Sequence, residues 1–98
     1  MNFSQALHEL KHGKKITRLA WSNDEWLYLV PENKYPAQTF AAKNYWRGKS
    51  ETVKLESGEV VPLVPYGAYI AIKTCQQNVI PWTPSQADIM ANDWQWKD

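Results

Sequence analysis

The fold class is decided by the segment Ala68–Thr74, which reads AYIAIKT. Its residues alternate between two sets along the chain, and alternation with a period of two predicts a β-strand. The polar triplet Gln76–Asn78 predicts a turn, and the apolar segment Val79–Trp82 that follows predicts a second strand. Two strands joined by a short turn pair antiparallel, so these segments predict an antiparallel sheet.

Two further hairpins are predicted earlier in the chain. The segments Ile16–Trp21 and Trp26–Val30 are separated by turn-forming residues. In the middle of the chain, Thr52–Leu55 and Val60–Leu63 flank a Ser-Gly turn. Because proline has no N–H to donate, the prolines of this region, Pro62 and Pro65, are expected to confine the second hairpin to the edge of a sheet.

Helices are predicted at both ends of the chain. Asn2 and Gln5 form a capping-box pattern, and apolar residues follow at helical spacing as far as Gly13. Near the C-terminus, Thr83 is predicted to cap a short helix that reaches about Ala91. A last strand is predicted near residues 94–96.

The sum of these elements is an α+β fold. We expect one small antiparallel sheet with an N-terminal helix and a short C-terminal helix. Because 98 residues suffice for one domain, we expect a single domain over residues 1–98. The segment Thr39–Trp46 fits either a helical turn or an irregular strand.

Charge and composition exclude several classes of protein. Eleven Lys and Arg against ten Asp and Glu give a net charge of +1, which is too small for binding long nucleic acids through bulk charge. No apolar run of about 18 residues predicts a membrane span, and the N-terminus lacks the apolar core of a signal peptide. The single Cys75 excludes an internal disulfide and fits a reducing cytoplasm.

The one motif that resembles a metal site is His8–His12, which spells the H-E-x-x-H of zinc proteases. At about 100° per residue, both histidines fall opposite the apolar face of the helix and point to solvent. A catalytic zinc also needs a third protein ligand. A nucleophilic Cys75 would need a base beside it, and both histidines fall on the far face of the first helix. From the histidines and the cysteine together, we expect no metal, no cofactor and no catalytic residue.

The unusual feature of the composition is its aromatic content: six Trp, five Tyr and two Phe make 13% of the chain. A core of this size does not fully bury six indoles, so some are expected at an interface or a ligand surface. If Leu27 faces the core, Trp26 and Tyr28 face outward as a flat stacking platform. Trp21 and Trp82 lie beside turns, where strand ends often form sites.

Aromatic residues also lie among cations in the middle of the chain, where Phe40, Tyr45 and Trp46 stand close to Lys43 and Arg47. Aromatic planes with cations suit a nucleobase with its phosphate. The same residue types are equally typical of a core or an oligomer interface, and the sequence alone leaves these alternatives open.

Five blocks of the sequence resemble the second class of Thoeris anti-defence proteins, a family of small phage and prophage proteins. The resemblance covers nearly the whole chain, apart from a variable hairpin at about Glu51–Pro62. The last block is the most specific. The blocks are Met1–Trp21, Trp26–Pro31, Thr39–Lys43, Tyr66–Thr74 and Val79–Trp94.

The resemblance implies a binding protein and not an enzyme. Members of the family hold a cyclic ADP-ribose-type signal that Thoeris defence makes from NAD, so that the host effector is not triggered. It also implies a homotetramer in the host cytoplasm with ligand pockets at subunit interfaces, and some relatives take up cyclic oligonucleotides. The alternatives are an oligomeric phage accessory module that binds a protein partner through exposed aromatics, and an enzyme that degrades the same nucleotide.

Carried over by position, the resemblance implies a ligand site of three kinds of contact. Aromatic rings stack on the adenine. Cations, a hydroxyl and backbone N–H groups hold the phosphates. Polar side chains contact the ribose or the adenine amine. Trp82 fits packing between helix and sheet equally well, and Asp93 fits a cap or an ion pair near the chain end. The predicted ligand-binding residues are Arg18, Trp21, Trp26, Thr39, Phe40, Lys43, Trp82, Ser85, Gln86, Asp88 and Asn92.

Overall fold

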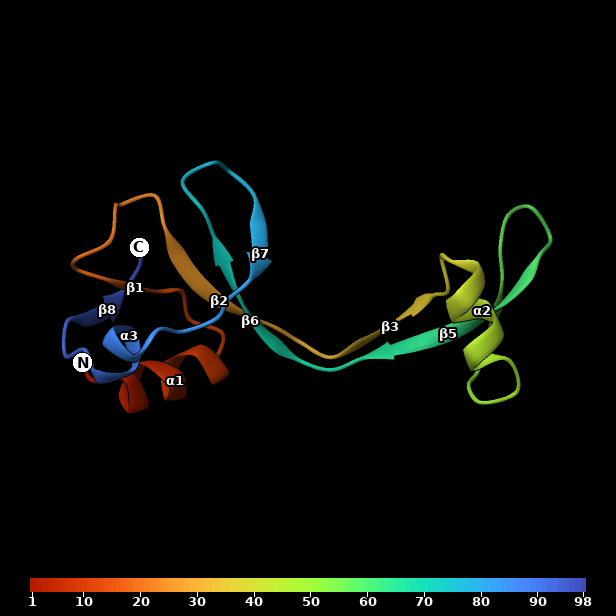
Figure 1. Cartoon of the computed structure of the whole chain (residues 1–98), viewed down its shortest axis with the longest axis horizontal. Helices are drawn as coiled ribbons and strands as arrows, with labels where there is room; N and C mark the ends of the chain where they lie inside the picture. Colours follow the sequence, from red (N-terminus) through yellow and green to blue (C-terminus); the bar gives the residue numbers. More distant parts are fainter. The chain divides into compact units, whose positions relative to one another are not determined.

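The computed structural model describes residues 1–98. The chain divides into two compact units (Figure 1): unit 1 comprises Met1–Val30 with Tyr69–Asp98, and unit 2 comprises Pro31–Ala68. Each unit contains antiparallel strands and at least one helix, which confirms the predicted α+β class. The strands form two sheets where one was expected, because strands of the middle of the chain pair with one another.

Unit 1 is built on a five-stranded antiparallel sheet with the strand order β7-β6-β2-β1-β8. The predicted strands of this unit and both of its predicted hairpins are confirmed, although β1 ends at Arg18, before the predicted end at Trp21. The elements of unit 1 are α1 (Phe3–Lys11), β1 (Ile16–Arg18), β2 (Trp26–Val30), β6 (Tyr69–Lys73), β7 (Val79–Pro81), α3 (Gln86–Met90) and β8 (Trp94–Trp96).

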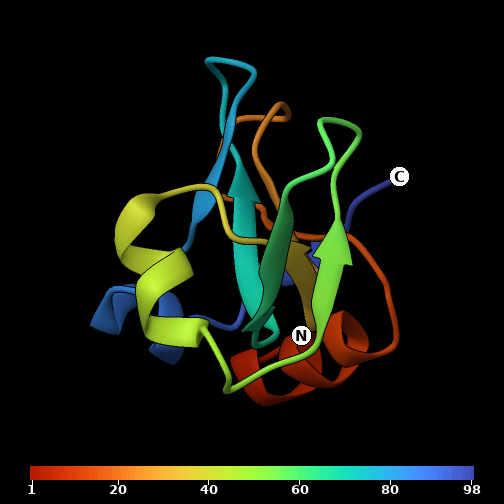
Figure 2. The ribbon, with the colours of Figure 1, turned by 90° about the vertical axis from the view of Figure 1, so that its right-hand side faces the viewer.

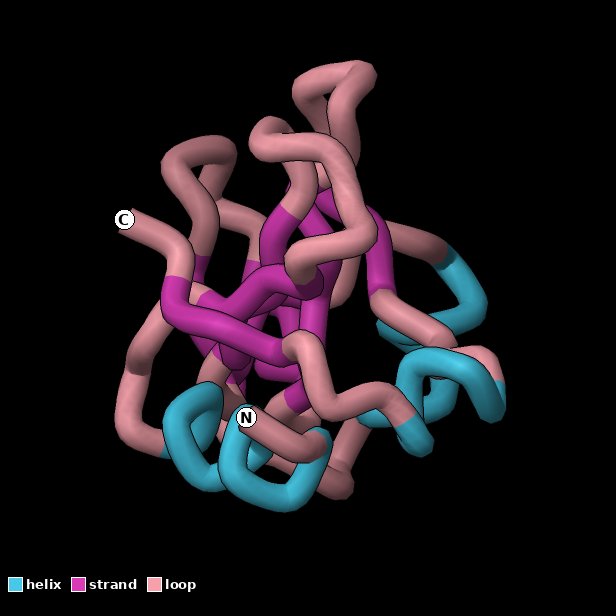
Figure 3. The backbone as a smooth tube through the Cα atoms, turned by 90° about the vertical axis from the view of Figure 1, so that its left-hand side faces the viewer, coloured by secondary structure: helices cyan, strands magenta, loops and turns pink.

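The first helix forms as its sequence predicts. The Asn2 side chain accepts a hydrogen bond from the Gln5 N–H at 2.8 Å, and the Gln5 side chain accepts one from the Asn2 N–H at 3.0 Å. Gly13 takes a φ of +83° just after the helix, a conformation that favours glycine. The helix packs on β1, β2 and β8, and Figure 3 shows this helix, next to the N-terminus, beside the strands. No helix of the structure has the length and apolar character needed to cross a membrane.

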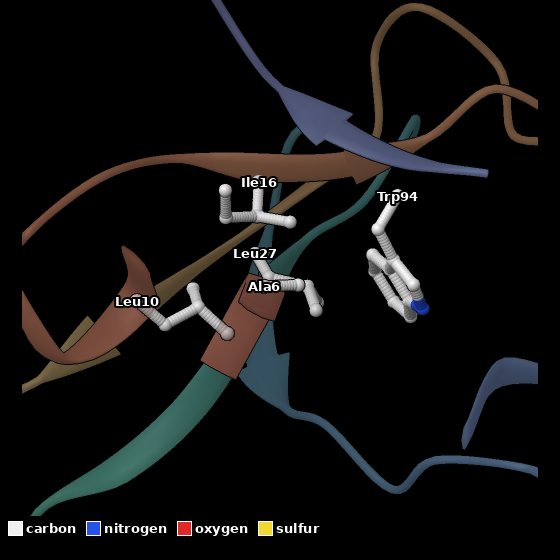
Figure 4. Close-up of a cluster of buried hydrophobic side chains, with 5 residues drawn as sticks. All are labelled: Ala6, Leu10, Ile16, Leu27 and Trp94. Atoms are coloured by element: carbon white, nitrogen blue, oxygen red, sulfur yellow. The ribbon is translucent and has the colours of Figure 1, made fainter. Parts of the chain in front are cut away.

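The core of unit 1 joins α1 to three strands. Ala6 and Leu10 from α1, Ile16 from β1, Leu27 from β2 and Trp94 from β8 converge in one cluster and are at most 1% exposed (Figure 4). Burying a large apolar side chain stabilises the fold by about 1.5–3 kcal/mol. This cluster therefore fixes the helix against the sheet and holds β8 at its edge.

The C-terminal helix begins later than predicted. Thr83 was expected to cap it, but Ser85 is the N-cap. The Ser85 Oγ accepts from the Asp88 N–H at 3.1 Å, and the Asp88 Oδ2 accepts from the Ser85 N–H at 3.0 Å. This reciprocal capping box satisfies two N–H groups at once, and Ser85 with Asp88 forms it where Thr83 with Gln86 does not.

Unit 2 is a three-stranded antiparallel sheet with the order β3-β5-β4 and one helix (Figure 2). The predicted central hairpin is confirmed as β4 and β5. The segment that fitted either a helical turn or a strand is α2, whose N-cap Thr39 accepts from the Ala42 N–H at 3.1 Å. The elements of unit 2 are β3 (Asn33–Pro36), α2 (Phe40–Trp46), β4 (Thr52–Lys54) and β5 (Val60–Tyr66).

The prediction that Pro62 and Pro65 lie on an edge strand is wrong, because β5 is the central strand of its sheet. The Leu63 N–H donates to Glu51 on the β4 side, so the alternation of the ladder turns the Pro62 nitrogen away from β4. Pro62 pairs with Thr52, the first residue of β4. On its other side it faces Ala37, one residue beyond the end of β3. Pro65 pairs with Lys34, outside the part of β5 that β4 covers. Each proline is therefore tolerated at a position of β5 where its nitrogen faces no neighbouring strand.

Candidate ligand-binding site

Four aromatic side chains of unit 1 lie together, namely the buried Trp94 and three rings around it. Its ring centroid lies 5.3 Å from that of Trp21, 5.6 Å from that of Phe3 and 5.9 Å from that of Trp82. Trp21 and Trp82 also contact each other edge-on, at 6.3 Å and 69°. Both are only partly buried, so each contributes one part of its ring to the core and leaves another part accessible. We call these four residues the aromatic cluster.

Arg18 lies beside the aromatic cluster and contacts two carboxylates. Its Nη1 donates to the Asp88 Oδ1 at 2.9 Å, and its Nε donates to the Asp93 Oδ1 at 2.8 Å. The guanidinium carbon is 6.0 Å from the centroid of the Trp94 ring. The Trp94 Nε1 donates to the backbone carbonyl of Asp88 at 2.9 Å. Aromatic and charged groups thus share one network that connects β1, α3 and β8.

The network keeps both carboxylates ionised. The side-chain hydrogen bond from Arg18 is the main cause that lowers the pKa of Asp93. Burial alone would raise the pKa of Asp88, but hydrogen bonds from Ser85 and Arg18 outweigh burial, so its pKa is also lowered. The hydrogen bonds to Asp93 and Asp88 in turn raise the pKa of Arg18. The expectation that Asp93 pairs near the chain end is confirmed.

The predicted phosphate contacts of this region are partly occupied within the chain. The Ser85 N–H donates to the Asp88 carboxylate, which also places negative charge in the first turn of α3. An anion there meets repulsion instead of a free N–H group. Gln86 and Asn92 are exposed at the two ends of α3 and make no side-chain hydrogen bond. Arg18 remains close to the cluster, although it is paired and not a free cation.

Trp26 lies on the other face of the five-stranded sheet. Its neighbour Leu27 is fully buried in the core, and consecutive strand residues point to opposite faces, as the sequence predicted. The Trp26 and Tyr28 rings form a pair with centroids 5.5 Å apart. The planes are tilted by 52°, so they do not form the expected flat platform. The Lys15 Nζ lies 5.0 Å from the Trp26 ring centroid, within reach of a cation–π interaction.

The remaining predicted residues lie in unit 2. Thr39 caps α2, so its hydroxyl is already a hydrogen-bond acceptor there. Phe40 is 80% exposed. Lys43 is 3.3 Å from the Glu59 carboxylate, and with Arg47 it borders a cavity of about 230 Å³. Arg47 forms no ion pair, so it is the cation of this cavity that remains available to an anion.

The structure therefore divides the eleven predicted residues into three places. Seven lie around the aromatic cluster and α3, Trp26 lies across the sheet, and Thr39, Phe40 and Lys43 lie in unit 2. The seven are Arg18, Trp21, Trp82, Ser85, Gln86, Asp88 and Asn92.

One further place, which the sequence did not predict, is a cavity of about 370 Å³ lined by Lys14, Lys15, Trp96 and Lys97. It forms because β1 pairs with β8, and no local sequence pattern predicts that pairing. His8 and His12 are exposed, as predicted, and the His12 Nδ1 is 2.8 Å from the His8 carbonyl. No three His, Cys, Asp or Glu side chains are grouped so that they could hold a metal ion.

Comparison with known proteins identifies the family. The model of the Thoeris anti-defense 2-like domain (Tad2-like) matches residues 1–96, which include both units. The chain is 28% identical over 94 residues to Thoeris anti-defense 2 of Bacillus phage SP01, a match that covers 96% of this chain and 91% of that protein. Because the family model matches nearly the whole chain, the protein belongs to the Thoeris anti-defense 2-like family.

Proposed function

We propose that this protein counters Thoeris defence by binding a cyclic ADP-ribose-type signalling nucleotide and holding it without degrading it. Membership of the Thoeris anti-defense 2-like family supports the anti-defence role. The observation that carries the binding role is the position of Arg18, Asp88 and Asp93 beside the half-buried rings of Trp21 and Trp82.

The aromatic cluster supplies the surface for the base. Trp21 and Trp82 are anchored on Trp94 by edge-on contacts, so their positions are set before a ligand arrives. A base that stacks on an aromatic ring gains about 1–3 kcal/mol. A preformed stacking surface avoids the cost of ordering side chains on binding, which favours the tight retention that sequestration requires.

The charged network supplies the polar contacts. Arg18 uses three of its N–H groups on Asp88 and Asp93, and a guanidinium has five. Two therefore remain for a phosphate. The carboxylates of Asp88 and Asp93 keep lone pairs that can accept from ribose hydroxyls or from the adenine amine. Because the pKa of each carboxyl is lowered, both stay ionised near neutral pH and are poor general acids. The network therefore suits binding more than turnover.

The proposal includes a homotetramer that acts in the host cytoplasm and binds its ligand at subunit contacts. Phe40 and Tyr45 on α2 are 80% and 60% exposed, and large exposed aromatic side chains are enriched in interfaces. The same two side chains favour the second candidate function, an accessory module that binds a protein partner.

A heat-release experiment tests the proposal. The purified protein is incubated with each cyclic ADP-ribose isomer, washed and heated, and the released compound is identified by mass spectrometry. Intact nucleotide is the expected result. An altered nucleotide would indicate an enzyme. No uptake of any isomer would contradict the proposal and favour the second candidate function, the partner-binding module.

Two variants then locate the site. Trp21→Ala and Trp82→Ala should each abolish uptake while the oligomer measured by light scattering persists. The matched control is Tyr35→Ala, which removes an exposed aromatic side chain of unit 2 outside α2. Normal uptake by both tryptophan variants would show that the stacking assignment is wrong.

A further inference from the structure

A small cavity of unit 2 lies between α2 and the hairpin of β4 and β5. It has a volume of about 230 Å³, and the helix packs on β5 beside it. The network of Arg18, Asp88 and Asp93 that carries the proposed nucleotide site lies in unit 1 and takes no part in this cavity. The lining of the cavity includes Lys43, Arg47, Thr52, Glu59, Val60 and Pro62.

The side chains of the lining come from one side of the helix and one face of the hairpin. Lys43 and Arg47 are four residues apart at the C-terminal end of α2, so they lie on the same side of the helix. Thr52 and Pro62 are paired neighbours on β4 and β5 and share a face of the sheet. Val60, two residues before Pro62 on the same strand, points to that face as well. The fold therefore brings these five side chains to one place.

The charges of the lining do not cancel. The Lys43 Nζ lies 3.3 Å from the Glu59 Oε2, so these two groups offset each other. Arg47 belongs to none of the five ion pairs of the structure. Two cations and one carboxylate thus leave one positive charge at the cavity. A ligand with one negative charge balances it, whereas a dianion brings excess negative charge close to Glu59.

The geometry of this free cation favours a carboxylate among the monoanions. A guanidinium presents its N–H groups as a planar fork that matches the two oxygens of a carboxylate. The side chain of Arg47 is exposed, so a ligand reaches it without displacing any part of the fold. The exposed Thr52 adds a hydroxyl that can donate a further hydrogen bond.

The hairpin supplies an apolar wall to the same cavity. Val60 is 61% exposed although it lies in a strand, and Pro62 adds a ring on the same face. An aliphatic chain that lies against this wall removes apolar surface from water. The volume is below the range of about 300–1,000 Å³ that is typical of sites for drug-sized ligands. The cavity therefore suits a ligand with a short chain.

We propose that this cavity of unit 2 binds a small carboxylate that carries an aliphatic chain. The Arg47 guanidinium holds the carboxylate, and the Thr52 hydroxyl donates to it. The chain lies against Val60 and Pro62. The ion pair of Lys43 with Glu59 holds α2 to the start of β5. Two ligands present this chemistry, namely a free aliphatic acid and the C-terminus of a peptide whose last residue is apolar.

Titration of the isotope-labelled full chain with 4-methylpentanoate, followed by NMR, tests the site. We expect saturable shifts of amides in α2, β4 and β5 at millimolar ligand, and no shifts in β2 and β6 of unit 1. Acetate lacks the chain and should bind about tenfold more weakly. The uncharged 4-methylpentanamide and the dianion sulfate should not bind. Shifts that do not saturate, or equal binding of the amide, would overturn the proposal.

A second ligand distinguishes the two sources of the carboxylate. N-acetyl-leucine has the same branched chain and presents its carboxylate as the end of a peptide does. Tighter binding of N-acetyl-leucine supports a peptide terminus as the occupant, and tighter binding of 4-methylpentanoate supports a free acid. Binding of neither compound would overturn the site.

Charge variants locate the carboxylate. Arg47→Gln should weaken 4-methylpentanoate at least about tenfold, because a charge-assisted hydrogen-bonded pair is lost. The matched control Lys49→Gln removes an exposed cation that lies over the Tyr45 ring, outside the lining of the cavity, and should change nothing. An equal loss in Lys49→Gln would show nonspecific attraction and would overturn the site. The amide spectrum of each variant shows directly that it is folded.

A variant of the apolar wall locates the chain. Val60→Thr keeps the shape of the side chain but replaces one methyl group by a hydroxyl, and Val60 is exposed enough for the fold to accept it. It should weaken 4-methylpentanoate a few fold and leave acetate unchanged. An unchanged affinity for 4-methylpentanoate would contradict the position of the chain.

The cyclic signal separates this proposal from the proposed function. Uptake of the cyclic ADP-ribose isomers by Arg47→Gln should be normal. Loss of that uptake would show that the cavity belongs to the nucleotide site, which would overturn the separate carboxylate site but not the sequestration. Failure of the wild-type protein to take up any isomer, with 4-methylpentanoate binding intact, would count only against the proposed function.

Discussion

The Nη1 of Arg18 lies 2.9 Å from the Oδ1 of Asp88, and this contact joins residues 70 positions apart in the chain. The Nε of the same guanidinium lies 2.8 Å from the Oδ1 of Asp93. Arg18 therefore holds the end of β1 to both ends of the segment that leads from α3 into β8. The aromatic cluster lies against this connection, so the connection sets the position of the rings as well as the charge beside them.

Acidification should weaken this connection. The folded pKa values of Asp88 and Asp93 lie below the ordinary value of 3.8. A lowered carboxyl pKa stabilises the fold above the unfolded pKa, and the stabilisation is lost as pH falls through the folded pKa. We expect the unfolding temperature to fall below about pH 4. In Arg18→Gln the fall over this window should be smaller, whereas Lys34→Gln, which removes an exposed pair, should behave like the wild type. An acid transition as large in Arg18→Gln would contradict the role of this network.

The core should depend strongly on Trp94. This side chain is 1% exposed and contacts Phe3, Trp21 and Trp82. Replacing a buried Trp by Ala typically costs about 3–5 kcal/mol because a cavity remains. Trp94→Ala should therefore lower the free energy of unfolding measured in urea by that amount. Trp96→Ala, on the same strand but 62% exposed, should cost less than about 1 kcal/mol, and equal losses would contradict the burial of Trp94.

The cap of α3 distinguishes two residues that are close in sequence. Ser85→Ala removes the hydroxyl that accepts from the Asp88 N–H and should cost about 1 kcal/mol. Thr83→Ala, at the residue that the sequence favoured as the cap, should cost less than about 0.5 kcal/mol. Urea unfolding of the two variants measures the difference. A larger loss for Thr83→Ala would place the start of the helix where the sequence predicted it.

The cap of α2 should act locally. Thr39 accepts from the Ala42 N–H, and α2 contains no buried residue, so packing contributes little to holding this helix. Thr39→Ala should increase hydrogen exchange of amides in α2 by about fivefold, as expected for a loss of about 1 kcal/mol. Amides of β2 and β6 in unit 1 are the internal control, and a uniform increase across both units would contradict a local effect.

Much of unit 1 could be predicted from local signals. The alternation in Tyr69–Lys73 and the capping box of Asn2 with Gln5 are short-range patterns, and both appear in the structure. The pairing of β1 with β8 could not be predicted, because it depends on the far end of the chain. That pairing brings together both the Arg18 network and the cavity lined by Lys14, Lys15, Trp96 and Lys97. The candidate sites were therefore less predictable than the strands.

The errors have physical reasons that sequence patterns do not contain. Pro62 and Pro65 are compatible with a central strand only because β3 and β4 each cover a different part of β5. Thr83 has the chemistry of a cap, but Ser85 has Asp88 three residues later as a reciprocal partner. Arg18 and Asp88 are predicted as ligand contacts of different kinds, and that role stays a prediction; their ion pair with each other is the part that no sequence pattern contains. In each case a partner elsewhere in the structure decided between chemically reasonable alternatives.

Unit 2 leaves the chain of unit 1 after Val30 and rejoins it at Tyr69, and these two residues are paired neighbours on β2 and β6. In terms of connectivity, the whole of Pro31–Ala68 is therefore the tip of one hairpin. The entropy of closing such a loop grows only slowly with its length. Unit 1 thus serves as a closed scaffold that tolerates loss, enlargement or exchange of this tip, and evolution can change one module while the other keeps its fold.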